Sequence, residues 1–351
     1  MIDLRSDTGT LPTADMRAAM AAGEVGDEQL RQDPTVNELQ RRAAELLGHE
    51  AALFLPTATM ANQIALKLLT RPGCLLLAEE QTHVLIFESG GPAVHAGLVT
   101  QGLPGVAGTI APEQLRAAAG RSANVEPASV VVLENTHRMA GGRVWPLPDF
   151  ESVVATAREL GLAVHLDGAR LMNSAVAAGL PAASYGRHAD TVTLCFSKGL
   201  GCPLGAVLAS SKERIEQAWR EKFLFGGAMR QAGIVAAAAV YALDHHLERL
   251  ADDHARARRL AEGLAAAGVA IGVDAVETNF VAIDIGALGL AVDKAHKRTA
   301  AEGVLVGDLA GRRVGAATYL GISDDDIEQA IARIARALVG TPMSVAERSS
   351  T

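Results

Sequence analysis

Aromatic residues, cysteines, long apolar runs and excess positive charge are all scarce in this sequence. Aromatics make up 3% of the chain, and the formal net charge is −8. Both values argue against nucleic acid as a partner, because proteins that bind its phosphate backbone are usually basic and those that bind unpaired bases stack them on aromatic side chains. The three cysteines have no paired spacing, which indicates neither a disulfide framework nor a structural zinc site. No apolar run reaches about 18 residues, so we expect no membrane span.

The remaining composition is typical of a globular, acidic protein. The 351 residues are 49% hydrophobic and 21% charged, which is enough apolar material for a sizeable core. The N-terminus is charged at once, at Asp3 and Arg5, and lacks the apolar centre of a signal peptide. We therefore expect a cytoplasmic protein.

Short apolar runs alternate with amphipathic stretches along the chain. The runs that we expect to form strands are 51–55, 74–78, 129–133, 163–167, 191–196 and 205–209. Each is apolar on both faces, as in strands that helices cover on both sides of a mostly parallel sheet. Strands alternating with helices predict an α/β fold.

Helix signals lie between these runs. Asp33-Pro34 predicts an N-cap and first turn, and apolar residues then recur at helical spacing until Gly48. Asp149 is interpreted as the cap of a helix over 149–160. A helix is also expected from about 59 to 70, directly after a strand.

The C-terminal third predicts a second, smaller unit. A long helical pattern over 235–265 is interpreted as a connecting helix. Residues 268–338 then predict a small α/β unit, with strands near 276–283 and 313–318 and a closing helix over 323–338. The predicted organisation is a large domain over 1–245 with an N-terminal arm over 1–14, a small domain over 246–340, and a frayed tail over 341–351.

Lys198 is the first residue that suggests chemistry. It follows the buried strand 191–196 in the tripeptide Ser197-Lys198-Gly199. A lysine held in such a low-dielectric place loses its charge more readily, as a Schiff-base lysine must. The alternative is an ordinary surface lysine in a glycine-containing turn.

Asp167 is the second such residue. It ends the strand 163–167, on the same face as His165, where open α/β sheets bind ligands. A buried carboxylate needs a cationic partner, and the ring nitrogen of pyridoxal phosphate would supply one. The alternative is a carboxylate that pairs with Arg170 or caps the next helix.

The segment Thr57-Ala58-Thr59 precedes the helix expected from about 59. Small hydroxyl residues at a helix N-terminus present free N–H groups and the positive end of the dipole to a phosphate. By itself the segment is also an ordinary helix cap. The order of phosphate cradle, aspartate and lysine suggests a pyridoxal-phosphate enzyme with the aspartate-aminotransferase type of fold.

Longer motifs make a specific resemblance. They are Arg5-Ser6-Asp7-Thr8, 32–39, Glu134-Asn135-Thr136-His137, Gly141-Gly142-Arg143, 165–170, 197–200 and 226–233. In this series the chain resembles the low-specificity L-threonine aldolases, over residues 1–245 in unbroken order and more weakly to about 338. The resemblance implies a large domain with a mostly parallel mixed sheet, a small C-terminal α/β domain, and pyridoxal 5'-phosphate as cofactor.

The resemblance also implies the site residues. Those assigned to the cofactor are Thr57, Ala58, Thr59, His83, Asp167, Arg170, Ser197, Lys198, Lys222 and Arg230. Lys198 would carry the internal aldimine, Asp167 would hold the ring nitrogen, and His83 would stack on the ring. Arg230, with Lys222, would reach the phosphate from a neighbouring subunit, because family members build the site at a dimer interface and often form homotetramers. No metal is implied.

The implied reaction cleaves L-threonine, L-allo-threonine or a related β-hydroxy-α-amino acid to glycine and an aldehyde, through a quinonoid. Ser6 and Arg170 would hold the substrate carboxylate. His83 and His137 are the candidates for moving the hydroxyl proton, because neutral imidazole is poised near pH 7. The chain would be a carbon–carbon lyase of amino-acid metabolism.

Several positions depart from the family pattern. Leu30 replaces an aromatic residue, with Arg31 beside it, and Ala58 replaces a glycine, which requires a negative φ there. Gly315 stands where the family has an arginine for the substrate carboxylate. Arg313, on the same face of that strand, is expected to replace it; Arg31 is a second candidate.

Two alternatives to threonine cleavage remain open. One is another pyridoxal-phosphate reaction, either β-elimination or the cleavage of a bulkier β-hydroxy amino acid. The other is a cofactor-binding subunit with little turnover, which only Gly315 and Leu30 favour.

Overall fold

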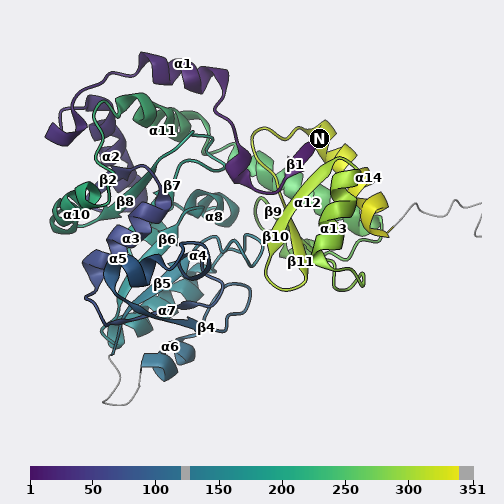
Figure 1. Ribbon diagram of the computed structural model, residues 1–351, viewed down its shortest axis with the longest axis horizontal. Helices are drawn as coiled ribbons and strands as arrows, with labels where there is room; N and C mark the ends of the chain where they lie inside the picture. Colours follow the sequence, from purple (N-terminus) through teal and green to yellow (C-terminus); the bar gives the residue numbers. More distant parts are fainter. Residues whose placement is uncertain (120–126, 340–351) are drawn as a thin grey trace, which may run out of the picture.

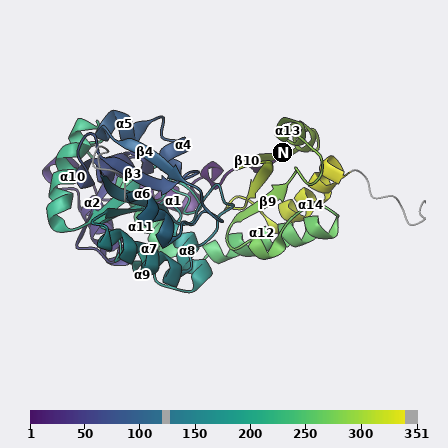
Figure 2. The ribbon, with the colours of Figure 1, turned by 90° about the horizontal axis from the view of Figure 1, so that it is seen from below.

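The computed structural model describes residues 1–119 and 127–339 of the chain. The predicted tail over 341–351 lies outside these ranges. Figures 1 and 2 show two units side by side, which we call the large and the small unit. Each has its own sheet and its own apolar cluster.

The large unit is built on a seven-stranded sheet in the order β2-β8-β7-β6-β5-β3-β4. The strands are β2 (Ala51–Leu55), β3 (Leu75–Glu79), β4 (Val99–Leu103), β5 (Ala128–Glu134), β6 (Ala163–Gly168), β7 (Thr191–Cys195) and β8 (Ala206–Ser210). β8 is antiparallel to both of its neighbours, and the other pairs are parallel. The predicted α/β fold with a mostly parallel mixed sheet is confirmed.

The six predicted strands all form, with ends shifted by no more than a residue or so. β4 was not predicted, because it lies at the sheet edge and exposes Val99, Thr100 and Gly102. An edge strand with one covered side lacks the continuous apolar run that marks the central strands.

Helices cover both faces of this sheet. Those of the first 200 residues are α1 (Ala14–Ala22), α2 (Pro34–Leu47), α3 (Ala58–Leu69), α4 (His83–Ile86), α5 (Gly91–Ala96), α6 (Pro112–Ala119), α7 (Leu147–Glu159), α8 (Leu171–Ala178) and α9 (Ala183–Gly186). The largest apolar cluster includes side chains of α2, α7, α8 and α11 (Gly233–His245), whereas α3 and α10 (Lys212–Leu224) pack in a different cluster against β2 and β8.

The predicted ends of α2 are confirmed, and those of α7 are not. Asp33 caps α2 through its bond from the Val36 N–H, 3.0 Å long, and Gly48 ends the helix at φ +74°. In α7 the N-cap is Pro146, and Asp149 lies within the first turn. Proline residues at 146 and 148 start this helix earlier than the aspartate signal indicates.

The single long helix expected over 235–265 is two helices, which is a correction. α10 (Lys212–Leu224) is followed by α11 (Gly233–His245) and α12 (Leu250–Ala266). The break leaves buried His246 with its Nδ1 2.7 Å from the Leu200 carbonyl oxygen, so that this side chain ties the break to the segment after Lys198.

The small unit holds a four-stranded sheet in the order β1-β10-β11-β9. Its strands are β1 (Ile2–Leu4), β9 (Phe280–Asp284), β10 (Val304–Leu309) and β11 (Arg313–Ala317), and its helices include α13 (Val292–Ala301) and α14 (Asp324–Val339). The expected strand near 276–283 begins only at Phe280, and β10 was not predicted.

The N-terminal arm was assigned to the large domain, but its β1 pairs in parallel with β10 of the small sheet. β1 has only three residues, which are too few to show the alternation of a strand, so this pairing could not be predicted from the sequence. The predicted division at residues 245–246 falls between α11 and α12 and stays a prediction. Within the described ranges, none of the helices has the length and hydropathy to cross a membrane.

Candidate active site

The C-terminal ends of β7, β6 and β5, which are neighbours in the sheet, gather the central candidates. Glu134 ends β5, Asp167 lies near the end of β6, and Lys198 follows β7. This is the edge at which open α/β sheets bind ligands. The sequence therefore placed Asp167 and Lys198 together because both follow buried parallel strands.

Asp167 is a buried carboxylate whose hydrogen bonds come from neutral donors. Asn62 Nδ2 donates to Oδ2 at 2.9 Å, and the Ala169 N–H donates to Oδ1 at 3.1 Å. Burial raises the pKa of Asp167, but the nearby charges of His83 and Lys198 outweigh it and lower the pKa below 3.8. The carboxylate is thus held as an anion, ready for a cationic partner.

A chain of hydrogen bonds behind Asp167 fixes its orientation. His165 lies 2.8 Å from Thr191 Oγ1 through Nδ1 and 3.0 Å from Asn62 Oδ1 through Nε2. Because the Asn62 amide nitrogen donates to Asp167, its oxygen accepts, so the His165 proton is on Nε2. Burial lowers the pKa of His165 to about 4, and the ring stays neutral at physiological pH.

Lys198 is partly buried and faces two carboxylates. Its charge acts on both Asp7 and Asp167 and lowers the pKa of each. Within the described ranges no hydrogen-bond partner of its ammonium is found, whereas its carbonyl accepts the Gly201 N–H at 2.8 Å. The amine is therefore positioned by backbone and left available for a ligand. The neighbouring Ser197 hydroxyl lies 3.4 Å from Cys195 Sγ.

The predicted phosphate cradle is the N-terminus of α3. Thr57 is its N-cap, and its hydroxyl accepts the Met60 N–H at 3.1 Å. The N–H groups of Ala58 and Thr59, in the first turn, have no intrahelical acceptor and remain for an anion. Ala58 is helical and is not among the positive-φ residues. The negative φ that alanine requires at this position is therefore present.

His83 begins α4 and is held by acidic residues. Its ring Nδ1 lies 2.9 Å from Glu88 Oε1, and its backbone N–H donates to Glu134 Oε2 at 2.8 Å. Because Glu88 accepts, Nδ1 carries a proton, and the partly exposed ring offers Nε2. Burial lowers the pKa of His83, but the bond to Glu88 and the charge of Asp167 outweigh it and raise the pKa above 6.5.

Glu88 is also a centre for amide donors. Asn62 Nδ2 donates to its Oε1 at 2.8 Å, and Gln63 Nε2 donates to its Oε2 at 2.5 Å. His83, Glu88 and Asp167 lie close enough for a metal ion, with one ligand atom of each within 4.8 Å of the others. Amide N–H groups directed at both carboxylates oppose a cation there, and we treat the cluster as a hydrogen-bond network.

His137 lies deeper than His83. Its Nδ1 accepts the Ala140 N–H at 3.2 Å, which places the proton on Nε2, 3.0 Å from Glu79 Oε2. Burial lowers the pKa of His137, but Glu134 and Glu79 outweigh it and raise the pKa. Nε2 lies close to Glu79 but makes no hydrogen bond within the described ranges, and the His137 side chain is 1% exposed, against 30% for His83. Exposure therefore favours His83 as the group that meets a substrate hydroxyl.

Arg170 is buried in an ion pair that sequence reasoning missed. Its Nε and Nη2 donate to Asp7 Oδ2 and Oδ1 at 2.8 and 2.6 Å. Burial raises the pKa of Asp7, but Arg170 and Lys198 outweigh it and lower the pKa. Ser6, beside Asp7, accepts the Thr8 N–H at 3.2 Å. The motif Arg5-Ser6-Asp7-Thr8 was the available signal, but only Ser6 of this motif was assigned a role from the sequence, and Asp7 was not.

Arg230 and Lys222 do not reach this edge of the sheet in the single chain. Arg230 pairs with Asp27 at 3.0 Å and is 62% exposed. Lys222 is fully buried, where it pairs with Glu28 and donates to the Phe54 carbonyl oxygen at 2.7 Å. This position does not support a role for Lys222 at a phosphate.

The Lys222–Glu28 pair makes a prediction about stability. Glu28→Ala should lower the free energy of unfolding by about 3–5 kcal/mol, because it leaves a buried ammonium without its anion. Urea unfolding measures the change. Glu216→Ala is the control, since it breaks an ion pair with Arg31 in which Glu216 is 61% exposed, worth about 0–1 kcal/mol. Equal losses in the two variants would contradict this account of the buried pair.

The two candidates for the missing carboxylate arginine are otherwise engaged. Arg313 donates to the Ala310 and Met139 carbonyl oxygens at 2.9 and 3.1 Å. Arg31 donates to both oxygens of Glu216, and its Cζ lies 4.7 Å from the Trp219 ring centroid. Arg313 does line a cavity of about 200 Å³ with His137 and Glu79, but its guanidinium serves mainly to dock β11 against the turn after β5.

The residues present fit pyridoxal phosphate. Among the residues that the structure describes, Asp167 is a buried anion without a hydrogen-bonded cation and Lys198 is an amine without a hydrogen-bonded partner, while α3 offers free N–H groups. A protonated ring nitrogen, an aldehyde and a phosphate are the groups that such a set of residues binds.

Comparison with known proteins agrees. Residues 3–287 match the family described as beta-eliminating lyases. The chain belongs to the beta-eliminating lyase family. The probable low-specificity L-threonine aldolase 2 of Arabidopsis thaliana is 38% identical over 335 residues, which are 93% of this chain and 94% of that protein. The low specificity L-threonine aldolase of Escherichia coli K12 is 40% identical over 288 residues, 82% of this chain and 85% of that protein.

The fold is shared with solved structures as well. The threonine aldolase of Leishmania major aligns with a TM-score of 0.82 at 19% identity, over 96% of this chain and 100% of that chain. Membership in the beta-eliminating lyase family confirms the predicted enzyme class, a lyase, and the predicted cofactor, pyridoxal phosphate.

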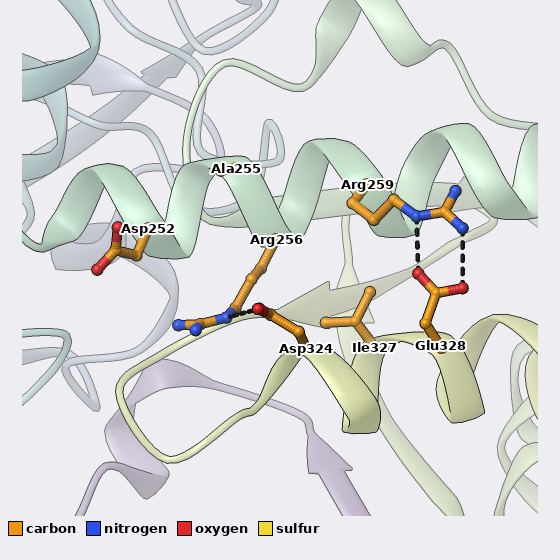
Figure 3. Close-up of a pocket in the computed structure, with 7 residues that line it drawn as sticks. All are labelled: Asp252, Ala255, Arg256, Arg259, Asp324, Ile327 and Glu328. Atoms are coloured by element: carbon orange, nitrogen blue, oxygen red, sulfur yellow. Dashed lines mark hydrogen bonds and ion pairs between the residues drawn. The ribbon is translucent and has the colours of Figure 1, made fainter.

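A surface pocket on the small unit lies apart from the residues of this lyase site (Figure 3). It has a volume of about 340 Å³ and lies between α12 and α14. Arg256 pairs with Asp324 at 2.7 Å, and Arg259 pairs with Glu328 at 2.7 Å. Because both arginines are already paired with carboxylates, we do not count this pocket as a binding site.

Proposed function

We propose that this chain is a pyridoxal-phosphate-dependent aldolase that cleaves L-threonine, L-allo-threonine and related β-hydroxy-α-amino acids to glycine and an aldehyde. The observation that carries the proposal is the meeting of Asp167, Lys198 and the α3 N-terminus at one sheet edge, in a chain whose relatives are named for threonine cleavage.

The residues divide the work by charge. With pyridoxal phosphate bound, Lys198 would hold its aldehyde carbon, Asp167 would balance its ring nitrogen, and the first turn of α3 with the Thr57 and Thr59 hydroxyls would bind its phosphate. The bound cofactor supplies an electron sink for the carbon–carbon bond that breaks. Buried Asn62 and His165 keep Asp167 in one orientation, so that little reorganisation is needed during the reaction.

His83 is the group that receives the substrate's hydroxyl proton, directly or through one water. Glu88 holds its Nδ1–H, which leaves the lone pair of Nε2 to accept a proton. Arg170 and Ser6 bind the amino-acid carboxylate, and Asp7 keeps the Arg170 fork aligned. His137 stabilises this wall of the site through Glu79.

Purified protein with pyridoxal phosphate tests the proposal. L-threonine should give equal amounts of glycine and acetaldehyde, measured by chromatography and by coupled reduction of the aldehyde. An amino-acid substrate that instead releases ammonia and a keto acid would establish β-elimination. Cofactor binding without turnover of any β-hydroxy amino acid would establish the non-catalytic alternative.

Glu88 makes the pH profile a test of the proton-transfer role. A base must be neutral to accept a proton, so activity should fall as pH drops through the raised pKa of His83. Glu88→Gln removes the hydrogen-bonded anion that most strongly raises this pKa, so the acid limb of the kcat profile should move to lower pH. A limb that stays in place would exclude His83 as the titrating base.

We further propose a cytoplasmic homo-oligomer, a dimer or a pair of dimers, with the site at the interface. Large apolar side chains on the surface support this: Leu30, Phe223, Leu224 and Ile234 are 64%, 44%, 70% and 48% exposed. Arg230 lies near them in sequence and would reach a neighbour's phosphate once its contact with Asp27 opens. Sedimentation equilibrium gives the number of subunits.

A further inference from the structure

Arg138 is a guanidinium at the rim of the site that the sequence analysis did not single out. Arg138 follows His137 in the turn after β5, and its backbone N–H donates to Glu134 Oε1 at 2.9 Å. Its Cζ lies 4.9 Å from the centroid of Phe87, and the Phe87 ring lies 5.4 Å from that of His83. The backbone bond and the ring contact hold the guanidinium on the His83 side of the site.

This guanidinium lacks an anionic partner. Its side chain donates to Met139 Sδ at 3.1 Å, and within residues 1–119 and 127–339 no carboxylate forms an ion pair with it. Its neighbours differ: Arg170 is paired with Asp7, and Arg143 is paired with Glu277. Sulfur is a weak acceptor, so most of the fork of donors is left for another molecule.

The surroundings make an empty fork unfavourable. Arg138 is partly buried, and burial and the like charge of Arg170 lower its pKa, although Asp7 and Glu134 oppose the effect. Arg138 follows β5 and Arg170 follows β6, and these strands are parallel neighbours, so both arginines lie at the same edge of the sheet. Two guanidinium groups near each other, with one already neutralised, form a place where an incoming anion is stabilised.

Within the described ranges, the two arginines that the sequence suggested for this part, Arg313 and Arg31, are engaged elsewhere. Arg313 docks β11 through carbonyl oxygens, and its bond to Met139 fixes the residue next to Arg138. Gly315, two residues along β11, carries no side chain, and a Cβ there would lie 3.0 Å from Leu309 Cγ. β11 thus offers the substrate no unengaged positive charge, whereas the turn after β5, against which β11 packs, carries Arg138.

We propose that Arg138 binds the α-carboxylate of the amino-acid substrate and sets the preference of the site for free amino acids. This inference rests on the proposed function, because it takes the substrate to be an amino acid bound beside Arg170. The planar fork suits a carboxylate, to which it donates two parallel hydrogen bonds. Arg138 thereby acts with Arg170, whose own fork Asp7 occupies.

The test compares two ligands on the holoenzyme. Glycine has the carboxylate and no side chain, and glycinamide has the same amine without the negative charge. Binding of each is followed by the change in cofactor absorbance, which requires no turnover. Arg138→Gln should weaken glycine binding by about 10- to 100-fold, the worth of a charged hydrogen bond, and should leave glycinamide binding nearly unchanged.

Two further variants sharpen the comparison. Arg138→Lys keeps the charge without the fork, and its glycine affinity should lie between those of wild type and Arg138→Gln. Arg259→Gln removes a remote, paired arginine and should change neither affinity. Thermal midpoints of all variants report whether the fold is kept.

Each contrary result has a distinct meaning. An unchanged glycine affinity in Arg138→Gln would overturn the inference. That result is also the one expected if Arg138 contacts only the side-chain end of a substrate, because glycine has no side chain. Equal weakening of glycine and glycinamide would overturn it in favour of a structural role. A wild-type protein that binds glycine but releases none from threonine would refute the proposed reaction and leave the carboxylate contact standing.

Discussion

Lys198→Ala should abolish glycine formation from L-threonine, with a loss in kcat of at least about 10³-fold, because the amine that binds the cofactor covalently is removed. No other lysine of the described chain is placed to replace it at this edge of the sheet. Lys222 is fully buried, and it is committed to Glu28 and the Phe54 carbonyl. The lost amine also leaves Asp7 and Asp167 without a shared cation.

The measurement pairs activity with absorbance. Wild-type holoenzyme should keep its visible band after gel filtration, and Lys198→Ala should lose both the band and the aldehyde product. Lys297→Ala is the control, because that lysine is 83% exposed on the small unit. A Lys198→Ala protein that keeps the band would move the covalent site to another residue.

Local pattern was enough to predict the parts of the site that follow buried strands. Asp167 and Lys198 each come after a continuous apolar run, and such runs form neighbouring parallel strands. The α3 cradle is likewise local, because a hydroxyl residue before a helix is a cap wherever the helix lies. The edge strand β4 was missed for the same reason, since its exposed side breaks the run.

Charge pairing between distant segments could not be predicted this way. Asp7 and Arg170 are 163 positions apart, and Lys222 and Glu28 are 194 apart. No period in the sequence joins them, because each pair depends on how the N-terminal arm or the Glu28 segment packs onto the large unit. Three arginines and a lysine expected at ligands were thus found with protein partners: Arg31, Arg230, Arg313 and Lys222.

Among the described residues, an arginine without an anionic partner is therefore informative. Where nearly every charged side chain near the site has a partner, a guanidinium that lacks one indicates a place for an external anion. Arg138 was passed over in the sequence because nothing in the local pattern separates it from a surface arginine. Only its position over Phe87, beside His83, gives it a role.

Asp167→Asn should reduce kcat by about 10²- to 10³-fold, because a neutral amide cannot balance the charge of a protonated ring nitrogen in a buried site. The substitution also disturbs its support. Asn62 Nδ2 and the Ala169 N–H donate to different oxygens of the carboxylate, and an amide has one oxygen to offer them. One donor is then left facing an NH₂ group, which adds a cost in cofactor affinity.

Steady-state rates at saturating cofactor separate the lost charge balance from the lost cofactor affinity. Added cofactor fills the site again, but it does not restore the negative charge opposite the ring nitrogen. Asp293→Asn, at an aspartate 74% exposed on α13, is the control. If Asp167→Asn kept more than about a third of wild-type kcat, a loss below 1 kcal/mol, the ring nitrogen would not depend on this carboxylate. The Asn62–His165 chain would then serve only to fill the space beneath the site.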